Sequence, residues 1–388
     1  MTHADIERWL ITTGRMQTDA VQLVADYIDQ CRAAGFPLSR FHIGLMVLHP
    51  VDMSYVINWT EGRDVMERRI PNTSFSEQQL QQSPFGELFR GADVFTCRLD
   101  EVPADELPYA LLQEMKAEGH THYIAHGLKF SDGQPTRAVS YATKRPGGFT
   151  DDEMASLQAL VPALSAVCEL RSHATRALTL LNTYLGPKTG RQVLDGKIAR
   201  GDGESIDAVV WMCDLRNFTR LSETLARDVL LDVLNDYFGA MTQAVEEHEG
   251  EVLKFIGDAM LAIFPVQEKQ HTACARAMKA VERVLQLLHD CNQDRRALGA
   301  VEIDFGIAVH LGQVHYGNIG GRTRLDFTVI GPAVNLASRI ESKTKELGQQ
   351  VLVSRAFFDQ FSDGLTHCAT VTLKGVQEPQ DLYQRRLS

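Results

Sequence analysis

The stretch "GEVLKFIGDAMLAIF", residues 250–264, contains two apolar, β-rich runs separated by the pair Gly257-Asp258. A Gly-Asp pair between two such runs is typical of a β-hairpin turn. The pattern therefore predicts a hairpin with Asp258 at its tip. Lys254 is unexpected, because it places a charge inside an otherwise apolar strand. Either Lys254 and Asp258 are both solvated, or they face a ligand.

The segments around this hairpin predict the fold of the C-terminal half. "DAVVWMCDL" at 207–215 reads as a strand, and a long amphipathic helix follows over 220–250. After the hairpin come a second helix, at about 269–293, and a strand, "VEIDFGIAVHLG", at 301–312. The order β-α-β-β-α-β is the split-βαβ arrangement, so we expect an α+β, ferredoxin-like domain over residues 205–388.

Two aspartates mark the ends of neighbouring strands in this predicted sheet. Asp214 ends the first strand and Asp258 lies at the hairpin tip. Their carboxylates would repel each other unless a cation lay between them, and Mg²⁺ takes one or two carboxylates plus substrate phosphates. Either aspartate alone is more simply a turn or cap residue. The pair, beside a helix start at "LRNFT" whose N–H groups can receive a phosphate, favours a metal-dependent phosphate site.

A second candidate pair lies on a predicted helix in "AVNLASRIES". Asn335 and Arg339 are four residues apart and therefore share one face. An Asn side chain can orient a sugar or phosphate, and an Arg can stabilise charge on a transferring phosphate. Taken alone, the pair is more simply a solvated helix face.

Three motifs together resemble the catalytic domain of class III adenylate/guanylate cyclases. They are "DLRNFT" at 214–219, "LKFIGDAMLAIF" at 253–264 and "TVIGPAVNLASRIES" at 328–342, and the resemblance covers residues 207–388. It implies conversion of a nucleoside triphosphate to a cyclic nucleotide and pyrophosphate with two divalent ions, Mg²⁺ or Mn²⁺.

The resemblance also implies roles for individual residues. Asp214, Asp258 and Leu215 match the metal-binding positions, and Asn335 and Arg339 match the catalytic ones. The positions that match substrate-binding residues are Lys254, Thr328, Lys374, Phe218 and Thr219.

Lys254 and Thr328 fall at the base-reading positions of the family. A Lys donor and a Thr hydroxyl acceptor suit the Watson–Crick edge of adenine, so the expected substrate is ATP. Guanylate cyclases of the family typically place Glu and Cys there. The Lys/Thr pair resembles a subgroup that includes bicarbonate-responsive adenylate cyclases, which makes bicarbonate or another small molecule a possible regulator. Guanylate cyclase activity and a degenerate, nucleotide-binding regulatory role are the alternatives.

Two residues depart from the family pattern. Asn217 occupies a position that is usually Gly, and Asn tolerates left-handed backbone better than most residues. Gln313, in "GQVHYG", stands where some members have a phosphate-binding Arg, so triphosphate binding is weaker or another cation compensates.

The family builds its site from two catalytic domains, which predicts a symmetric homodimer with ATP bound at the interface. Residues 151–204 are the expected helical linker and dimer seam. The linker opens with a capping-box pattern, Thr150 to Glu153, and Pro162 either kinks the helix or marks its start. Its apolar residues repeat at helical spacing, and they are Leu157, Leu160, Leu164, Val167, Ala174, Leu178, Leu181 and Leu185.

Residues 1–150 are similar to the GAF/PAS-like sensory domains that precede many cyclases, with a helix followed by several strands. No motif identifies their ligand. His120, His122 and His126 lie close in sequence, and they are either ordinary strand and turn residues or ligands of a metal or haem.

Composition narrows the class of protein. The chain has 388 residues, enough for two domains, and its net charge of -11 argues against nucleic-acid binding. We find no signal-peptide core and no apolar run long enough to cross a membrane. Seven dispersed cysteines without a CxxC pair indicate reduced thiols. These features predict a soluble, cytoplasmic protein.

Overall fold

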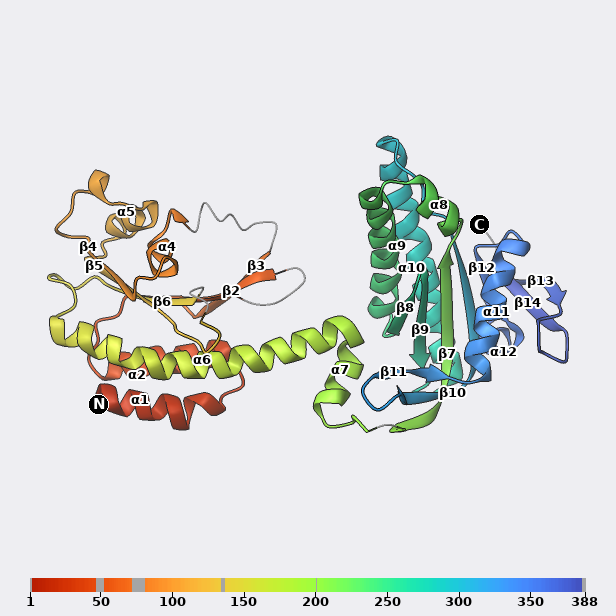
Figure 1. Cartoon of the computed structure of the whole chain (residues 1–388), viewed down its shortest axis with the longest axis horizontal. Helices are drawn as coiled ribbons and strands as arrows, with labels where there is room; N and C mark the ends of the chain where they lie inside the picture. Colours follow the sequence, from red (N-terminus) through yellow and green to blue (C-terminus); the bar gives the residue numbers. More distant parts are fainter. Residues whose placement is uncertain (1, 47–51, 72–80, 134–136, 200, 386–388) are drawn as a thin grey trace. The chain divides into compact units, whose positions relative to one another are not determined.

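The computed structural model describes residues 2–46, 52–71, 81–133, 137–199 and 201–385 (Figure 1). It divides into two compact units, one up to Leu180 and one from Leu181 onward. The division falls inside the stretch 151–204 that the sequence predicts as a linker. None of the described helices combines the length and the apolar character needed to cross a membrane.

The first unit is built on a six-stranded antiparallel sheet with the order β3-β2-β1-β6-β5-β4. Its strands are β1 (Arg40–Met46), β2 (Asp52–Thr60), β3 (Met66–Pro71), β4 (Val94–Arg98), β5 (His122–Gly127) and β6 (Arg137–Thr143). Its helices are α1 (His3–Thr12), η1 (Gly14–Met16), α2 (Ala20–Ala33), α4 (Pro84–Phe89), η3 (Ala104–Glu106), α5 (Ala110–Ala117) and α6 (Asp151–Leu185). This confirms the predicted α+β architecture.

Each face of this sheet is covered by its own hydrophobic cluster, because successive side chains of a strand point to opposite faces. One face packs against α1, α2 and α6, where the hydroxyl oxygens of the buried Tyr27 and Tyr141 lie 2.9 Å apart. The other face packs against α4 and α5, with Leu112 and Tyr123 fully buried.

Helix α6 corrects part of the linker prediction. The capping box is present, since Glu153 N–H donates to Thr150 Oγ1 at 3.2 Å and Thr150 N–H donates to Glu153 Oε2 at 2.8 Å. The helix begins at Asp151 and contains Pro162, so that proline does not mark its start. The first half of the apolar stripe was wrongly predicted as dimer seam, because it is buried in the core of its own unit. These residues are Leu157, Leu160, Leu164 and Val167.

The three histidines do not form one metal site. His122 Nε2 lies 2.8 Å from Thr96 Oγ1, and its Nδ1 accepts a hydrogen bond from Phe149 N–H. His126 is four residues along the same strand, about 13 Å away at strand rise. Burial lowers the pKa of both histidines to about 4. Among the described residues, no group of three His, Cys, Asp or Glu is arranged to hold a metal.

The second unit contains an eight-stranded sheet in which β13-β14-β12-β10-β7-β9-β8 follow one another and β11 pairs with β10. Its strands are β7 (Gly203–Leu215), β8 (Glu251–Ile256), β9 (Ala259–Pro265), β10 (Phe305–Gly320), β11 (Leu325–Ile330), β12 (Val351–Ser354), β13 (Leu365–Val371) and β14 (Gln380–Arg385). Its helices are α7 (Pro187–Leu194), α8 (Phe218–Thr224), α9 (Arg227–Glu247), α10 (Gln270–Ala297), α11 (Pro332–Glu346) and α12 (Arg355–Phe358).

The order β10-β7-β9-β8 is that of a split-βαβ sheet, which confirms the ferredoxin-like prediction. Helices α9 and α10 lie side by side on one face of the sheet (Figure 1), and α11 packs on the other face. The predicted helix over 220–250 is in fact two helices, because Leu225 and Ala226 adopt extended backbone between them.

Helix α7 is held to the sheet of the second unit by a buried carboxylate. The Glu251 side chain, at the start of β8, is 4% exposed. Its Oε1 accepts hydrogen bonds from Thr189 Oγ1 of α7 and from Tyr316 OH of β10, both at 2.8 Å. A buried carboxylate is stable only when such donors surround it, so the three elements depend on one another.

Replacing Tyr316 by Phe removes one of these donors and leaves Glu251 under-satisfied. We expect the local free energy of unfolding of β8 and β10 to fall by about 1–3 kcal/mol, measured by backbone hydrogen exchange. Ser362→Ala is the control, because Ser362 is exposed in the same unit and the loss of its hydroxyl should change the free energy of unfolding by no more than about 0.5 kcal/mol. Equal effects in the two variants would contradict the role given to the Tyr316 hydroxyl.

Candidate active site

Asp214 and Asp258 meet at one end of the sheet. Asp214 is the penultimate residue of β7, and it pairs in register with Ala259 of β9, the residue directly after Asp258. The hairpin turn that carries Asp258 closes through Gly257, whose φ of +65° is the left-handed conformation that glycine adopts most easily. The predicted hairpin is therefore present and its tip lies beside the end of β7.

The carboxyl group of Asp214 is strongly perturbed by its surroundings. The pKa of Asp214 is raised to about 7, first by burial, then by a hydrogen bond with Asp258 and by the Asp258 charge. The charge of Glu341 on α11 raises it further. The pKa of Glu341 is itself raised, chiefly by its own burial and also by Asp258. Negative charge is therefore concentrated here, and the charge of Arg216, which acts to lower the pKa of Glu341, offsets only part of it.

Glu341 is a site neighbour that the sequence did not reveal. Helix α11 crosses β10 at Gly306, which pairs in register with Asp214. A Cβ atom built on Gly306 would lie 2.8 Å from Glu341 Oε1, so the absence of a side chain there admits the glutamate. A glycine inside a strand often marks such a close approach. Gly306 was therefore the sequence signal that another element packs closely beside Asp214.

The donor set fits a hard divalent cation. Two interacting carboxylates are oxygen ligands of the kind Mg²⁺ and Mn²⁺ prefer, and a cation would remove their repulsion. In the described part of the chain no third acidic, His or Cys side chain completes a ligand set. The protein thus supplies two carboxylate ligands and leaves the remaining coordination positions of the cation to substrate or water.

The loop after Asp214 leads directly into α8. Leu215 is buried, Phe218 is half-buried and Thr219 is exposed at the first turn of the helix. Asn217 lies directly before Phe218. Its φ of 60° and ψ of 22° are in the left-handed region, as expected for an Asn at a position that is usually Gly. No side chain in the described ranges caps the helix start, so its first N–H groups are open to an acceptor.

Asn335 and Arg339 lie on α11, with Asn335 exposed and Arg339 half-buried. A Cβ atom on Gly375 would lie 3.4 Å from Arg339 Nη2, which places the guanidinium beside the loop that carries Lys374. The buried Leu373 and Ile340 share one hydrophobic cluster and fix this loop against α11. Arg339 therefore lies beside the loop that carries Lys374.

The site residues of α11 point in different directions. An α-helix turns about 100° per residue, so Arg339 lies about 160° and Asn335 about 120° around the axis from Glu341. Glu341 faces Asp214 and Asp258. Within one chain, Asn335 and Arg339 therefore face away from the carboxylate pair.

Lys254 and Thr328 form a separate group with an additional residue, Asp326. The Lys254 ammonium donates a hydrogen bond to the Asp326 carboxylate across β8 and β11. Thr328 is two residues from Asp326 on β11 and shares its face. The Thr328 side chain is 4% exposed, and its hydroxyl has no hydrogen-bond partner among the described residues. Gln313 is exposed on β10.

Comparison with known proteins concerns the second unit. Residues 203–382 match the family model for the adenylate and guanylate cyclase catalytic domain. An adenylate cyclase of Anabaena cylindrica is 35% identical over 185 residues, which are 45% of this chain and 36% of that protein. Adenylate cyclase 1 of Rhizobium meliloti (strain 1021) is 32% identical over 177 residues, 44% of this chain and 26% of that protein.

Among solved structures, the guanylyl cyclase Cya2 is 32% identical, with a TM-score of 0.43 over 47% of this chain and 93% of that chain. The match to the two curated relatives spans about a third of their length or less.

The raised pKa of Asp214 predicts how pH changes the stability of the metal-free protein. Between the ordinary pKa of 3.8 and about 7, the folded state holds a proton that the unfolded state has lost. The free energy of unfolding should therefore fall as pH rises through this window. After allowing for screening of a half-exposed group, we expect a loss of about 1–2 kcal/mol.

Urea unfolding of the metal-free wild type and of Asp214→Asn at pH 4.5 and 7.5 measures this loss. The Asn variant should lack it, whereas Asp363→Asn, at an exposed position of the same unit, should retain it. An unchanged pH dependence in Asp214→Asn would show that the carboxyl pair is not under this strain.

Proposed function

Residues 203–382 belong to the adenylate and guanylate cyclase catalytic domain family, and on that premise we propose that this chain is a class III adenylate cyclase. It converts ATP to 3′,5′-cyclic AMP and pyrophosphate. The observation that carries the proposal is the convergence of Asp214 and Asp258 beside the open start of α8. The naming of the two curated relatives as adenylate cyclases supports it.

The reaction forms a bond between the ribose 3′-oxygen and the α-phosphorus. It breaks the bond from the α-phosphorus to the bridging oxygen, and the hydroxyl proton is lost. Asp214 and Asp258 would hold Mg²⁺ or Mn²⁺, two ions by family resemblance, which acidify the 3′-hydroxyl and neutralise phosphate charge when bound. The N–H groups at the start of α8, near Phe218 and Thr219, would receive phosphate oxygens.

Negative charge that develops on the transferring phosphate needs hydrogen-bond donors on the side away from the carboxylate pair. Arg339 is suited to this role, because its guanidinium offers several donors in a fixed plane. Lys374, on the neighbouring loop, would contact the terminal phosphates, and Asn335 would orient the ribose. The position of the Arg339 guanidinium beside Gly375, the residue after Lys374, supports their action as one group.

Base selection would fall to Lys254 and Thr328. A buried hydroxyl without a partner is costly, and a ligand that supplies the missing hydrogen bond removes that cost. Adenine offers a donor to Thr328 at its exocyclic amine and an acceptor to Lys254 at N1.

A homodimer would complete the site. The carboxylate pair and Arg339 face different directions in one chain, so each site would draw its two halves from two chains. Apolar side chains exposed along β8 support an interface there, since Phe255 is 52% and Ile256 50% exposed. On α6, an apolar row at spacings 4, 3, 4 and 3 fits a coiled-coil seam. It is exposed at Leu170, Ala174, Ala177 and Tyr184 and half-buried at Leu181.

The first unit would act as a GAF/PAS-like sensory domain that regulates the catalytic unit through α6. Bicarbonate activation stays a prediction, which rate measurements at fixed pH and varied bicarbonate would test.

Turnover of ATP and GTP by the full chain, with Mg²⁺ and with Mn²⁺, tests the proposed activity. We expect cyclic AMP from ATP, and at least a 100-fold loss in Asp258→Ala because the metal site loses half its charge. Asp363→Ala should retain full activity. Preference for GTP would contradict the adenine assignment, and nucleotide binding without turnover would favour the degenerate regulatory role.

Thr328→Val tests base recognition separately from folding. Removing an unpaired buried hydroxyl should leave the free energy of unfolding unchanged or raise it slightly. The kcat/KM for ATP should fall about tenfold, since one hydrogen bond to the base is lost. Thr328→Ser keeps the hydroxyl and should retain most of the wild-type kcat/KM. Equal activity in Thr328→Val and Thr328→Ser would rule out a hydroxyl contact to adenine.

A further inference from the structure

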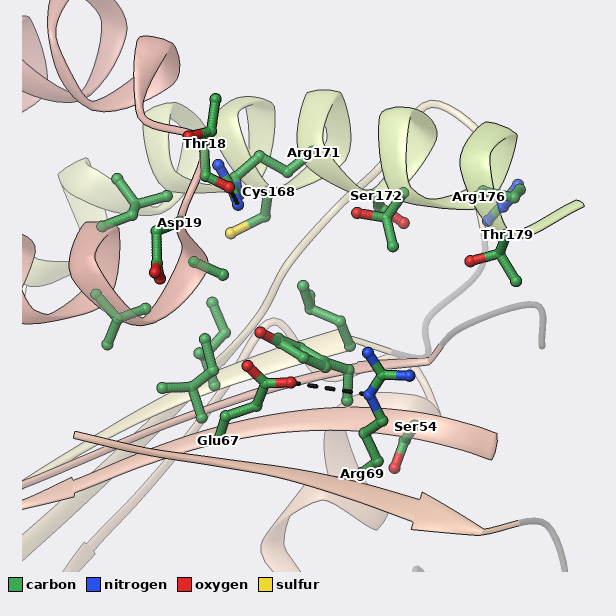
Figure 2. Close-up of a pocket in the computed structure, with 18 residues that line it drawn as sticks. Thr18, Asp19, Ser54, Glu67, Arg69, Cys168, Arg171, Ser172, Arg176 and Thr179 are labelled. Atoms are coloured by element: carbon green, nitrogen blue, oxygen red, sulfur yellow. Dashed lines mark hydrogen bonds and ion pairs between the residues drawn. The ribbon is translucent and has the colours of Figure 1, made fainter. Parts of the chain in front are cut away.

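The first unit contains a cavity of about 380 Å³ between α2, α6 and strands β1 to β3. This volume is within the range of small-molecule sites, about 300–1,000 Å³. One wall is apolar, with Leu23 and Val24 from α2 and Ile43 and Ile57 from the sheet. Figure 2 shows polar side chains on the other walls, from α6 above and β3 below.

Positive charge predominates on the polar walls. Three arginines line the cavity, Arg69, Arg171 and Arg176, against two acids, Asp19 and Glu67. Both acids are already engaged. Glu67 lies 3.8 Å from Arg69 as an ion pair. The Asp19 carboxylate caps α2, accepting hydrogen bonds from the N–H groups of its first turn at 2.8 and 3.1 Å.

The two arginines of α6 have no carboxylate partner in the described part of the chain. Arg171 donates its hydrogen bonds to backbone carbonyls, at 2.7 Å to Thr18 and also to Gln17. Arg176 makes no ion pair or hydrogen bond among the described residues, and its Nε is buried without a partner. A buried, unsatisfied donor in a native fold requires an explanation, and an acceptor bound in the cavity would provide one.

We propose that this cavity binds a small organic anion with an apolar body, whose head group lies at Arg176 and whose body lies against α2 and the sheet. Guanidinium groups bind carboxylate and phosphate heads in the same way, through paired N–H donors. A cationic head would meet the excess of arginines, and a neutral one would leave the charge of Arg176 unpaired.

The position of the cavity gives its occupant a direct contact with α6. Six lining residues belong to this helix, at spacings of 3, 1, 3, 1 and 3 that keep them on one face, and they are Cys168, Arg171, Ser172, Thr175, Arg176 and Thr179. The mean direction of the apolar row from Leu170 to Tyr184 lies about 170° around the α6 axis from that of the lining residues, and the nearest members of the two sets are about 60° apart. An occupant and a second copy of the chain would therefore not compete for the helix.

Isothermal titration of the full chain with four probes tests the proposal. Decanoate and octyl phosphate carry the two anionic heads, 1-decanol is neutral and decylammonium is cationic. We expect at least one anion to bind with 1:1 stoichiometry, at least tenfold more tightly than 1-decanol and decylammonium. Absence of binding, or equal binding of all heads, would overturn the proposal.

Two variants locate the site. Arg176→Gln should weaken binding of that anion at least tenfold, while Arg176→Lys should recover part of the loss. Arg8→Gln, at an exposed position of α1 outside the cavity, should bind as wild type does. Wild-type affinity in Arg176→Gln would contradict the assignment. Binding is read without cyclase turnover, so its outcome is independent of the proposed catalytic function.

Discussion

The mutual repulsion of Asp214 and Asp258 is the constraint on which the catalytic unit depends. Backbone pairing of β7 with β9 places Asp214 opposite Ala259 and so holds the turn that carries Asp258 beside the end of β7. Burial and the nearby Glu341 strengthen the repulsion and raise the pKa of Asp214 to about 7. The fold thus maintains an unfavourable arrangement that a divalent cation would relieve, which is a common property of metal-dependent sites.

The same rigid sheet separates the remaining residues from that pair. Helix α11 presents Glu341 to the carboxylates, so the helical repeat turns Arg339 away from them. Lys254 is only four residues from Asp258, but it lies inside β8 whereas Asp258 lies in the turn after it, and Lys254 contacts Asp326 on β11. A single chain therefore carries two incomplete sets of site residues, and we infer that two chains complete each other.

Local sequence patterns were sufficient to predict much of the fold and of the candidate site. The Gly257-Asp258 turn, the left-handed Asn217 and the split-βαβ order all follow from short patterns, and all are present. Glu341 and Asp326 were missed because their partners are distant in sequence. The apolar stripe at Leu157 to Val167 was misassigned because a helix that packs on its own sheet and one that packs on a second copy show the same periodicity.

Mixing two inactive variants tests the central inference most directly. Asp214→Ala disables the metal-binding set of residues, and Arg339→Ala disables the set that contacts the transferring phosphate. A heterodimer of the two variants therefore retains one intact site. We expect each variant alone to be inactive and the co-expressed or remixed pair to recover up to about a quarter of wild-type turnover, since half of randomly formed dimers are mixed and each has one site of two. No recovery in a mixture shown to contain heterodimers would contradict a site shared between two chains.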